Sequence, residues 1–162
     1  MEDSDKKRTL NQILKLIPGS QAHISLDSAL SDLTVDVASK VPEGMPYSIW
    51  QLLEHIRIAQ DDILSFSADA EGYKSLKWPH DYWPEHEAPV DQEALEKSIQ
   101  DVLNGIEKMQ DLVEEKSDSL FKAIPNGDGQ TLFREAVLLS QHNAYHIGQI
   151  VVLRRLLGEL DD

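Results

Sequence analysis

The chain has 162 residues, enough for one domain with its own hydrophobic core, and its 41% hydrophobic and 27% charged residues are typical of a globular protein. Its formal charge of −14 disfavours binding to nucleic acids and to anionic membranes, because both require an excess of Lys and Arg. The sequence has no cysteine, which excludes disulfides, thiolate metal ligands and a cysteine nucleophile.

The sequence lacks a recognisable targeting or membrane-spanning segment. The N-terminal stretch MEDSDKKR has mixed charge and no apolar core, so it is not typical of a signal peptide. No run approaches the roughly 20 apolar residues that a membrane span needs. We therefore expect a single cytoplasmic domain over residues 1–162.

The N-terminal region predicts two helical segments of unequal length. The first is a short amphipathic segment of one or two turns, ended by Pro18-Gly19, with the apolar residues Leu10, Ile13, Leu14 and Ile17. Ser20 is then placed to cap a first long helix. The apolar stripe of that helix is His23, Leu26, Leu30 and Leu33. The connector VPEGMP at residues 41–46 cannot continue a helix.

The clearest helix start in the sequence is the segment SIWQ at residues 48–51. It is a capping box, in which the Ser48 hydroxyl and the Gln51 side chain each satisfy a backbone N–H at the helix terminus. Tyr47 and Leu52 occupy the two positions of a hydrophobic staple. His55 lies at the border of the apolar stripe of this second helix, which is Ile49, Leu52, Leu53, Ile56, Ala59, Ile63 and Phe66.

Residues 70–89 predict a long loop, because the segment KWPHDYWP at 77–84 combines three aromatic residues with two prolines and has no helical period. Loops of this length in compact domains are often functional. Asp91 then caps a third helix, whose inner residues are Leu95, Ile99, Val102, Ile106, Met109 and Val113. After a turn at residues 125–129, Thr131 caps a last helix that runs from about Leu132 to Leu157. Four amphipathic helices without a credible strand predict an all-α four-helix bundle.

The last helix carries the strongest functional signal. His142 and His146 are four residues apart, so both rings project from one helical face and can bind the same metal ion. His55 occurs in a similar context on the second helix. Three imidazoles from two helices would form a metal site with positions left for water or substrate, which is more typical of catalytic than of structural sites.

Three polar residues near these histidines each have more than one possible role. His23, on the apolar side of the first long helix, is a fourth ligand, a group that touches a ligand, or a core histidine. Asp62, one heptad after His55, accepts a hydrogen bond from a ligand ring, acts as a general base, or is a surface acid. Gln149 either orients His146 or packs between helices.

The aromatic residues of the long loop also have two possible roles. Trp78, Tyr82 and Trp83 either form a roof over the metal pocket or pack the loop onto the bundle. His80 and His86 lie in the same stretch, and loop histidines of this kind usually have no special role.

Two segments resemble the histidine motifs of the DinB/YfiT-like superfamily. They are SIWQLLEHI at 48–56, followed by DIL at 62–64, and HNAYHIGQI at 142–150. The loop segment at 78–84 is similar to one found in a branch of that superfamily. The resemblance covers a core of about residues 20–158.

That resemblance implies a four-helix bundle with up-down-down-up topology. It also implies a divalent metal, often nickel or zinc, bound by His55, His142 and His146. Characterised relatives include thiol-dependent S-transferases and isomerases that use small thiols such as bacillithiol or mycothiol.

Three functions remain open on the sequence. The first is a metal-dependent enzyme that transfers a low-molecular-weight thiol to a small-molecule substrate. The second is a metal-dependent hydrolase with Asp62 as general base, and the third is a bundle that binds a metal or small ligand without catalysis. None of the three requires nucleic acid or a membrane as a partner.

Apolar residues outside the predicted core bear on assembly. Leu112, Leu120 and Phe121 lie off the inner face of the third helix, and the N-terminal segment needs a surface to cover it. Either the N-terminal segment folds back over its own bundle, or a homodimer forms. The resemblance favours a homodimer.

Overall fold

The computed structural model describes residues 3–19, 21–68, 72–125 and 127–160, so the predicted cap Ser20 lies outside the described residues. Within them the structure is all-α, as predicted, and contains no β-strand. None of the described helices is sufficiently long and apolar to span a membrane. The helices are α1 (Asp3–Leu16), α2 (Leu26–Leu30), α3 (Val35–Ser39), α4 (Ile49–Ala68), α5 (Gln92–Glu115) and α6 (Leu132–Leu156), with two 3-10 turns, η1 (His80–Tyr82) and η2 (Ser117–Ser119).

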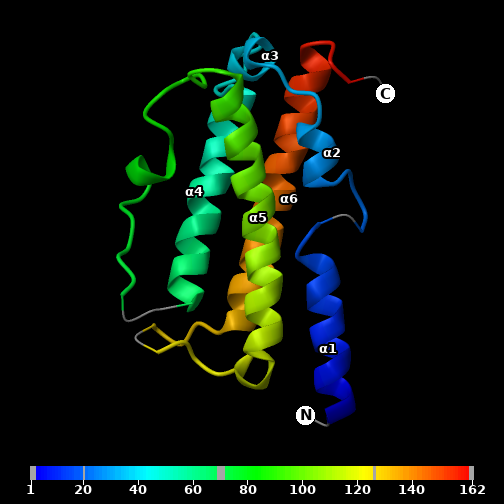
Figure 1. Cartoon of the computed structure of the whole chain (residues 1–162), viewed down its shortest axis with the longest axis vertical. Helices are drawn as coiled ribbons and strands as arrows, with labels where there is room; N and C mark the ends of the chain where they lie inside the picture. Colours follow the sequence, from blue (N-terminus) through cyan, green and yellow to red (C-terminus); the bar gives the residue numbers. More distant parts are fainter. Residues whose placement is uncertain (1–2, 20, 69–71, 126, 161–162) are drawn as a thin grey trace.

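Three long helices form the centre of a helical bundle (Figure 1). α4 packs against both α5 and α6, while α1 and α2 pack against α5 and α6 from another side. In Figure 1, α4 and α5 both run downward, whereas α6, α1 and α2 run upward. The predicted helical bundle is therefore confirmed, with α1 and α2 in the place expected for a single first helix.

The prediction of a first long helix from Ser20 is wrong. The N-terminal helix that was expected to span one or two turns is instead α1, with 14 residues. The segment that follows α1 and contains His23 is not helical. Of the predicted stripe, His23 precedes α2, Leu26 and Leu30 lie in α2, and Leu33 follows the turn after it.

Local capping explains this break. Ser25 Oγ accepts a hydrogen bond from the backbone N of Ser28 at 3.1 Å, and Thr34 Oγ1 accepts one from Val37 N at 3.3 Å. Each bond starts a new short helix. Between the two caps, Asp32 has a φ of 54°, a left-handed conformation that a continuous α-helix does not allow. Capping and backbone conformation thus outweigh the apolar period.

The N-terminal helix covers its own bundle. Ile13 of α1 and Ile17, which directly follows α1, are buried in the main core. Leu120 is also buried, and Phe121 packs against Phe133 with ring centroids 5.1 Å apart. These contacts are consistent with the N-terminal segment folding back over its own bundle, whereas Phe121 remains 46% exposed, so the homodimer stays a prediction.

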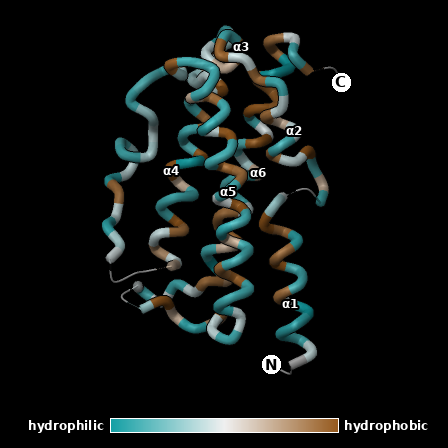
Figure 2. Tube along the Cα trace, in the orientation of Figure 1, coloured by the Kyte–Doolittle hydropathy of each residue, from teal (hydrophilic) through white to brown (hydrophobic). Residues whose placement is uncertain are grey.

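Capping hydrogen bonds begin the three long helices at the predicted residues. At α4, Ser48 Oγ accepts from the backbone N of Gln51 at 3.2 Å, and Gln51 Oε1 accepts from Ser48 N at 2.9 Å. Asp91 and Thr131 cap α5 and α6 through side-chain oxygens that accept from a backbone N–H three residues later. Figure 2 shows apolar residues recurring between polar ones along each of these helices, which gives each an apolar face for the core.

The loop between α4 and α5 returns the chain along the outer side of α4 (Figure 1). This path is needed because α4 and α5 run in the same direction. Two hydrogen bonds fix its second half to the start of α4: Trp50 Nε1 donates to the carbonyl of His86 at 3.1 Å, and Ser48 Oγ donates to the carbonyl of Glu87 at 3.3 Å. The turn η1 also lies against α4.

Arg154 of α6 attaches the interrupted N-terminal region to the bundle. The residue is only 4% exposed, and its Nη1 donates to the carbonyl oxygens of Ala29 at 3.0 Å and Ser31 at 2.9 Å. These carbonyls lie at the C-terminal end of α2, where a helix leaves backbone acceptors without partners. Removing the guanidinium would leave such acceptors unsatisfied in a buried environment.

We therefore expect Arg154→Met to destabilise the fold. The free energy of unfolding, measured by urea denaturation, should fall by about 2 kcal/mol, because one buried and one partly buried carbonyl lose their charged donor. Arg155→Met, which changes an exposed neighbour on the same helix, is the matched control and should shift stability by less than about 0.5 kcal/mol. Equal effects of the two substitutions would contradict the proposed role of Arg154.

Candidate metal centre

The contact between α4 and α6, which run in opposite directions, brings the three predicted histidines together. His55 lies on α4, and His142 and His146 lie one turn apart on α6. The potential donor atoms of the three side chains all lie within 4.8 Å of one another. Ring centroids are 5.0 Å apart for His55 and His142, 4.7 Å for His55 and His146, and 4.5 Å for His142 and His146. Among the described residues, no carboxylate or further histidine joins this group.

Two of the rings are held in place through their Nδ1 atoms. His55 Nδ1 donates to the backbone carbonyl of Tyr82 at 2.7 Å, and His146 Nδ1 donates to Gln149 Oε1 at 2.6 Å. A carbonyl oxygen can only accept, so Nδ1 carries the proton and Nε2 keeps its lone pair. Metal-binding histidines typically have such a partner on the second ring nitrogen. Of the two roles considered for Gln149, its position fits the one that orients His146.

The spacing of the rings fits a shared ion. His142 Nε2 lies 3.1 Å from His55 Nε2, and His142 Nδ1 is buried without a hydrogen-bond partner among the described residues. Two nitrogens that bind one ion at about 2.1 Å lie about 3.0 to 3.4 Å apart for angles between 90° and tetrahedral. A set of three imidazoles with no thiolate can hold a divalent metal ion.

Burial keeps the three rings neutral. Desolvation, together with the charges of His146 and His55, lowers the pKa of His142 to about 3. Desolvation also lowers the pKa of His55 and of His146, against the opposing effects of their hydrogen bonds to Tyr82 and Gln149. Neutral imidazole is the form that binds metals, so protons do not compete for these nitrogens at neutral pH.

The aromatic loop contacts the site through two of its three predicted residues. The Trp83 ring stacks on His55, with centroids 4.3 Å apart and planes 12° apart, and Tyr47 stacks on Trp83 at 4.5 Å. Tyr82 supplies the carbonyl that holds His55. Trp78 is 73% exposed and makes an edge contact with the Tyr82 ring at 5.4 Å. The loop thus covers one face of His55 while Trp78 lies farther out.

Asp62 lies beside the loop and makes no direct contact with a histidine. Its Oδ1 accepts from the Tyr73 hydroxyl at 2.8 Å and its Oδ2 from the Tyr82 hydroxyl at 2.7 Å. Burial and these hydrogen bonds raise the pKa of Tyr73 to about 12 and also raise the pKa of Tyr82, so both hydroxyls stay protonated. One role considered for Asp62 was to accept a hydrogen bond from a ligand ring. In the structure the Tyr82 carbonyl has this role, because it accepts from His55. Tyr73 had no recognisable signal in the sequence, because it lies in an irregular segment.

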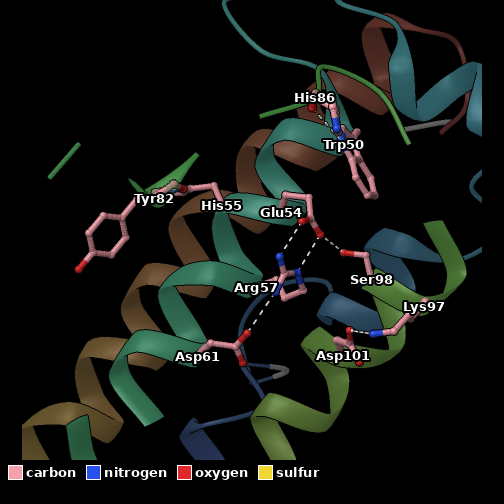
Figure 3. Close-up of polar contacts among 10 residues, drawn as sticks. All are labelled: Trp50, Glu54, His55, Arg57, Asp61, Tyr82, His86, Lys97, Ser98 and Asp101. Carbon is pink, nitrogen blue, oxygen red and sulfur yellow. Dashed lines mark hydrogen bonds and ion pairs between the residues drawn. The ribbon is translucent and has the colours of Figure 1, made fainter. Parts of the chain in front are cut away.

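A partly buried ion pair on another side of α4 helps to fix the rotation of this helix (Figure 3). Glu54 is 8% exposed, pairs with Arg57 at 2.8 Å and accepts a hydrogen bond from Ser98 of α5. Arg57 also pairs with Asp61 at 3.1 Å. Because these contacts face α5, His55 is turned toward the loop and α6. Sequence reasoning missed this network, since a Glu–Arg pair three residues apart is common on helix surfaces.

His23 is not part of the centre. The sequence placed it on the apolar side of a helix, but it is exposed in a non-helical segment, where Nδ1 bonds to the carbonyl of the next residue, Ile24. The break in the predicted first helix explains this difference. His80 and His86 are also exposed, as expected for loop histidines.

Comparison with known proteins identifies the family. The model of the DinB superfamily matches residues 20–150. The chain belongs to the DinB superfamily. Members of this superfamily bind metals, which agrees with the group of three histidines found here.

The fold is also similar to that in a crystal structure of a conserved protein from Enterococcus faecalis, with a TM-score of 0.58 and 17% identity over 98% of this chain and 99% of that one. At this identity the likeness concerns the fold alone. No curated protein matches the DinB-like chain.

The lowered pKa values predict that the metal-free protein loses stability on acidification. Unfolded histidines take up protons near pH 6.5, whereas the buried rings resist protonation, so the unfolded state binds more protons below that pH. We expect the melting temperature of chelator-treated protein to fall between about pH 7.5 and pH 5.5. The fall should be smaller in His142→Gln and unchanged in His86→Gln, a control at an exposed histidine. An unchanged pH dependence in His142→Gln would contradict this assignment.

Proposed function

We propose that this DinB-like protein is a divalent-metal-dependent S-transferase that joins a low-molecular-weight thiol to a small electrophilic molecule. The convergence of His55, His142 and His146, without another ligand from the described residues, is the observation that carries the proposal. Such a site has positions left for a substrate. Three imidazoles are compatible with nickel or zinc as the ion.

The absence of cysteine from the sequence also supports a thiol as co-substrate. For a reaction that uses a sulfur nucleophile, a protein without cysteine must obtain it from a small molecule, such as bacillithiol or mycothiol. A bound divalent ion would supply positive charge that favours the thiolate at neutral pH. In the transfer, the sulfur forms a bond to the electrophilic carbon, the leaving group departs with its electron pair, and the thiol proton passes to solvent.

The residues around the histidines would prepare the site for such a reaction. Gln149 and the Tyr82 carbonyl hold two rings in one tautomer, so their Nε2 atoms remain available as ligands. Trp83 and Tyr47 cover one face of His55 with stacked rings. An apolar wall of this kind excludes water and suits an uncharged electrophile.

A hydrolase is less well supported. That function required Asp62 as a general base, but both of its carboxylate oxygens already accept hydrogen bonds from tyrosine hydroxyls. A base must also lie within hydrogen-bond reach of the reacting water, and Asp62 is not part of the group formed by the three histidines. The hydrolase and the non-catalytic binding protein therefore serve as alternative outcomes of the experiments below.

Metal content is the first prediction. Protein purified without chelators and reloaded with nickel or zinc should contain about one ion per chain by elemental analysis. His146→Ala should retain far less, because it removes one of three ligands, and His86→Ala should match the wild type. Less than about a tenth of an equivalent in the wild type after reloading would exclude the metal-dependent functions.

Thiol transfer is the second prediction. Metal-loaded protein should consume bacillithiol or mycothiol in the presence of a model haloarene, and His146→Ala should be at least about tenfold slower. His86→Ala controls for a histidine change outside the site. Equal rates for wild type and His146→Ala would rule out the transferase. Hydrolysis of an ester or amide panel without thiol would instead support the hydrolase, and metal binding without turnover the binding protein.

A further inference from the structure

Tyr82 makes two contacts with α4 that connect the metal centre to a carboxylate outside it. Its backbone carbonyl accepts from His55 Nδ1 at 2.7 Å, and its hydroxyl donates to Asp62 Oδ2 at 2.7 Å. Seven residues separate His55 from Asp62, a rise of about 10.5 Å along one rigid helix. The long side chain of Tyr82 bridges this distance, so both of its polar ends are attached to α4.

We infer that Asp62 is a positioning residue that fixes the orientation of His55 through Tyr82. This inference rests on the proposed metal site, whose ligand His55 is the group being positioned. Asp62 thus acts at a distance from the ion, in a role that the sequence did not indicate.

The irregular structure of the loop explains why the Tyr82 carbonyl needs an anchor. The only regular structure in the described part of the loop is the three-residue turn η1, which ends at Tyr82. A carbonyl at the end of such a short turn has little backbone support of its own. The hydroxyl bond to Asp62 ties this residue to α4, and the next residue, Trp83, stacks on His55. This anchor therefore lies beside both contacts that the loop makes with the His55 ring.

Tyr73 provides a matched comparison within the same structure. Its hydroxyl donates to Oδ1 of the same carboxylate at 2.8 Å, and its ring packs against Phe66 with centroids 5.2 Å apart. Removing either hydroxyl deletes one bond to Asp62. Only Tyr82, however, also accepts a hydrogen bond from His55, through its backbone carbonyl. The two tyrosines therefore separate positioning of His55 from a general effect on loop stability.

The test compares Tyr82→Phe, Tyr73→Phe, Asp62→Leu and the double variant Asp62→Leu/Tyr82→Phe in the full chain. Cobalt(II) is the probe, because its visible spectrum reports the ligand geometry and its affinity can be measured by competition with a chelating dye. Thermal melting of each variant establishes that it is folded. Loss of a group that orients a ligand typically weakens metal binding by about 10- to 100-fold.

We expect Tyr82→Phe and Asp62→Leu each to weaken cobalt binding by about tenfold and to alter the spectrum. Tyr73→Phe should keep the spectrum and change affinity by less than about threefold. Adding Tyr82→Phe to Asp62→Leu should have little further effect, because both remove the same connection. Wild-type affinity and spectrum in Tyr82→Phe, or equal losses in Tyr73→Phe and Tyr82→Phe, would overturn the inference.

A second readout separates this inference from the proposed function. If the wild type binds no ion, the proposed function fails, and the inference is then judged on the metal-free protein by NMR of the histidine ring nitrogens. His55 should be the Nδ1–H tautomer in wild type and Tyr73→Phe, and a mixture of tautomers in Tyr82→Phe. An unchanged His55 tautomer in Tyr82→Phe would overturn the inference whatever the outcome for metal binding.

Discussion

The burial of three imidazole rings between α4 and α6 is the constraint on which the rest of the site depends. A protonated ring in this position would be a charge removed from water and repelled by any neighbouring ring that was also protonated. The rings therefore stay neutral, and a neutral ring needs an acceptor for its one N–H. Tyr82 and Gln149 supply acceptors for His55 and His146. His142 has no such acceptor on Nδ1, and its Nε2 lies 3.1 Å from the Nε2 of His55, a spacing that fits a cation bound between the two rings.

The pairing of His142 with His146 and the starts of the long helices could be predicted from the sequence, because local helix geometry and capping determine them. His142 and His146 share a face in any α-helix, and caps such as Ser48 and Asp91 fix where the long helices begin. His55 required more information. It joins the pair only if α4 and α6 pack side by side with His55 at the height of the pair, which periodicity does not encode; its similar helical context suggested its inclusion, and the family resemblance supported it.

The contacts made by the loop and the first helix could not be predicted, for different reasons. Tyr82 holds His55 through a backbone carbonyl, a group that every residue has, so no sequence pattern marks it. The partners of Asp62 depend on which loop residues return to α4. In the N-terminal region, the period of Leu26 and Leu30 fitted a long helix, but those residues are buried equally well by the short helix α2. The apolar pattern alone did not distinguish the two.

The direction of the helices also explains why the loop between α4 and α5 lies beside His55. α4 has 20 residues and is about 30 Å long. Because α5 runs parallel to it, the chain must travel back over that length before α5 can begin. The return path follows the outer side of α4 (Figure 1), the side from which Tyr82 and Trp83 reach His55. A connection that the topology requires is thus also the segment that covers one face of His55. Because it lies outside the bundle core, its sequence can change the chemistry around His55 without repacking the helices.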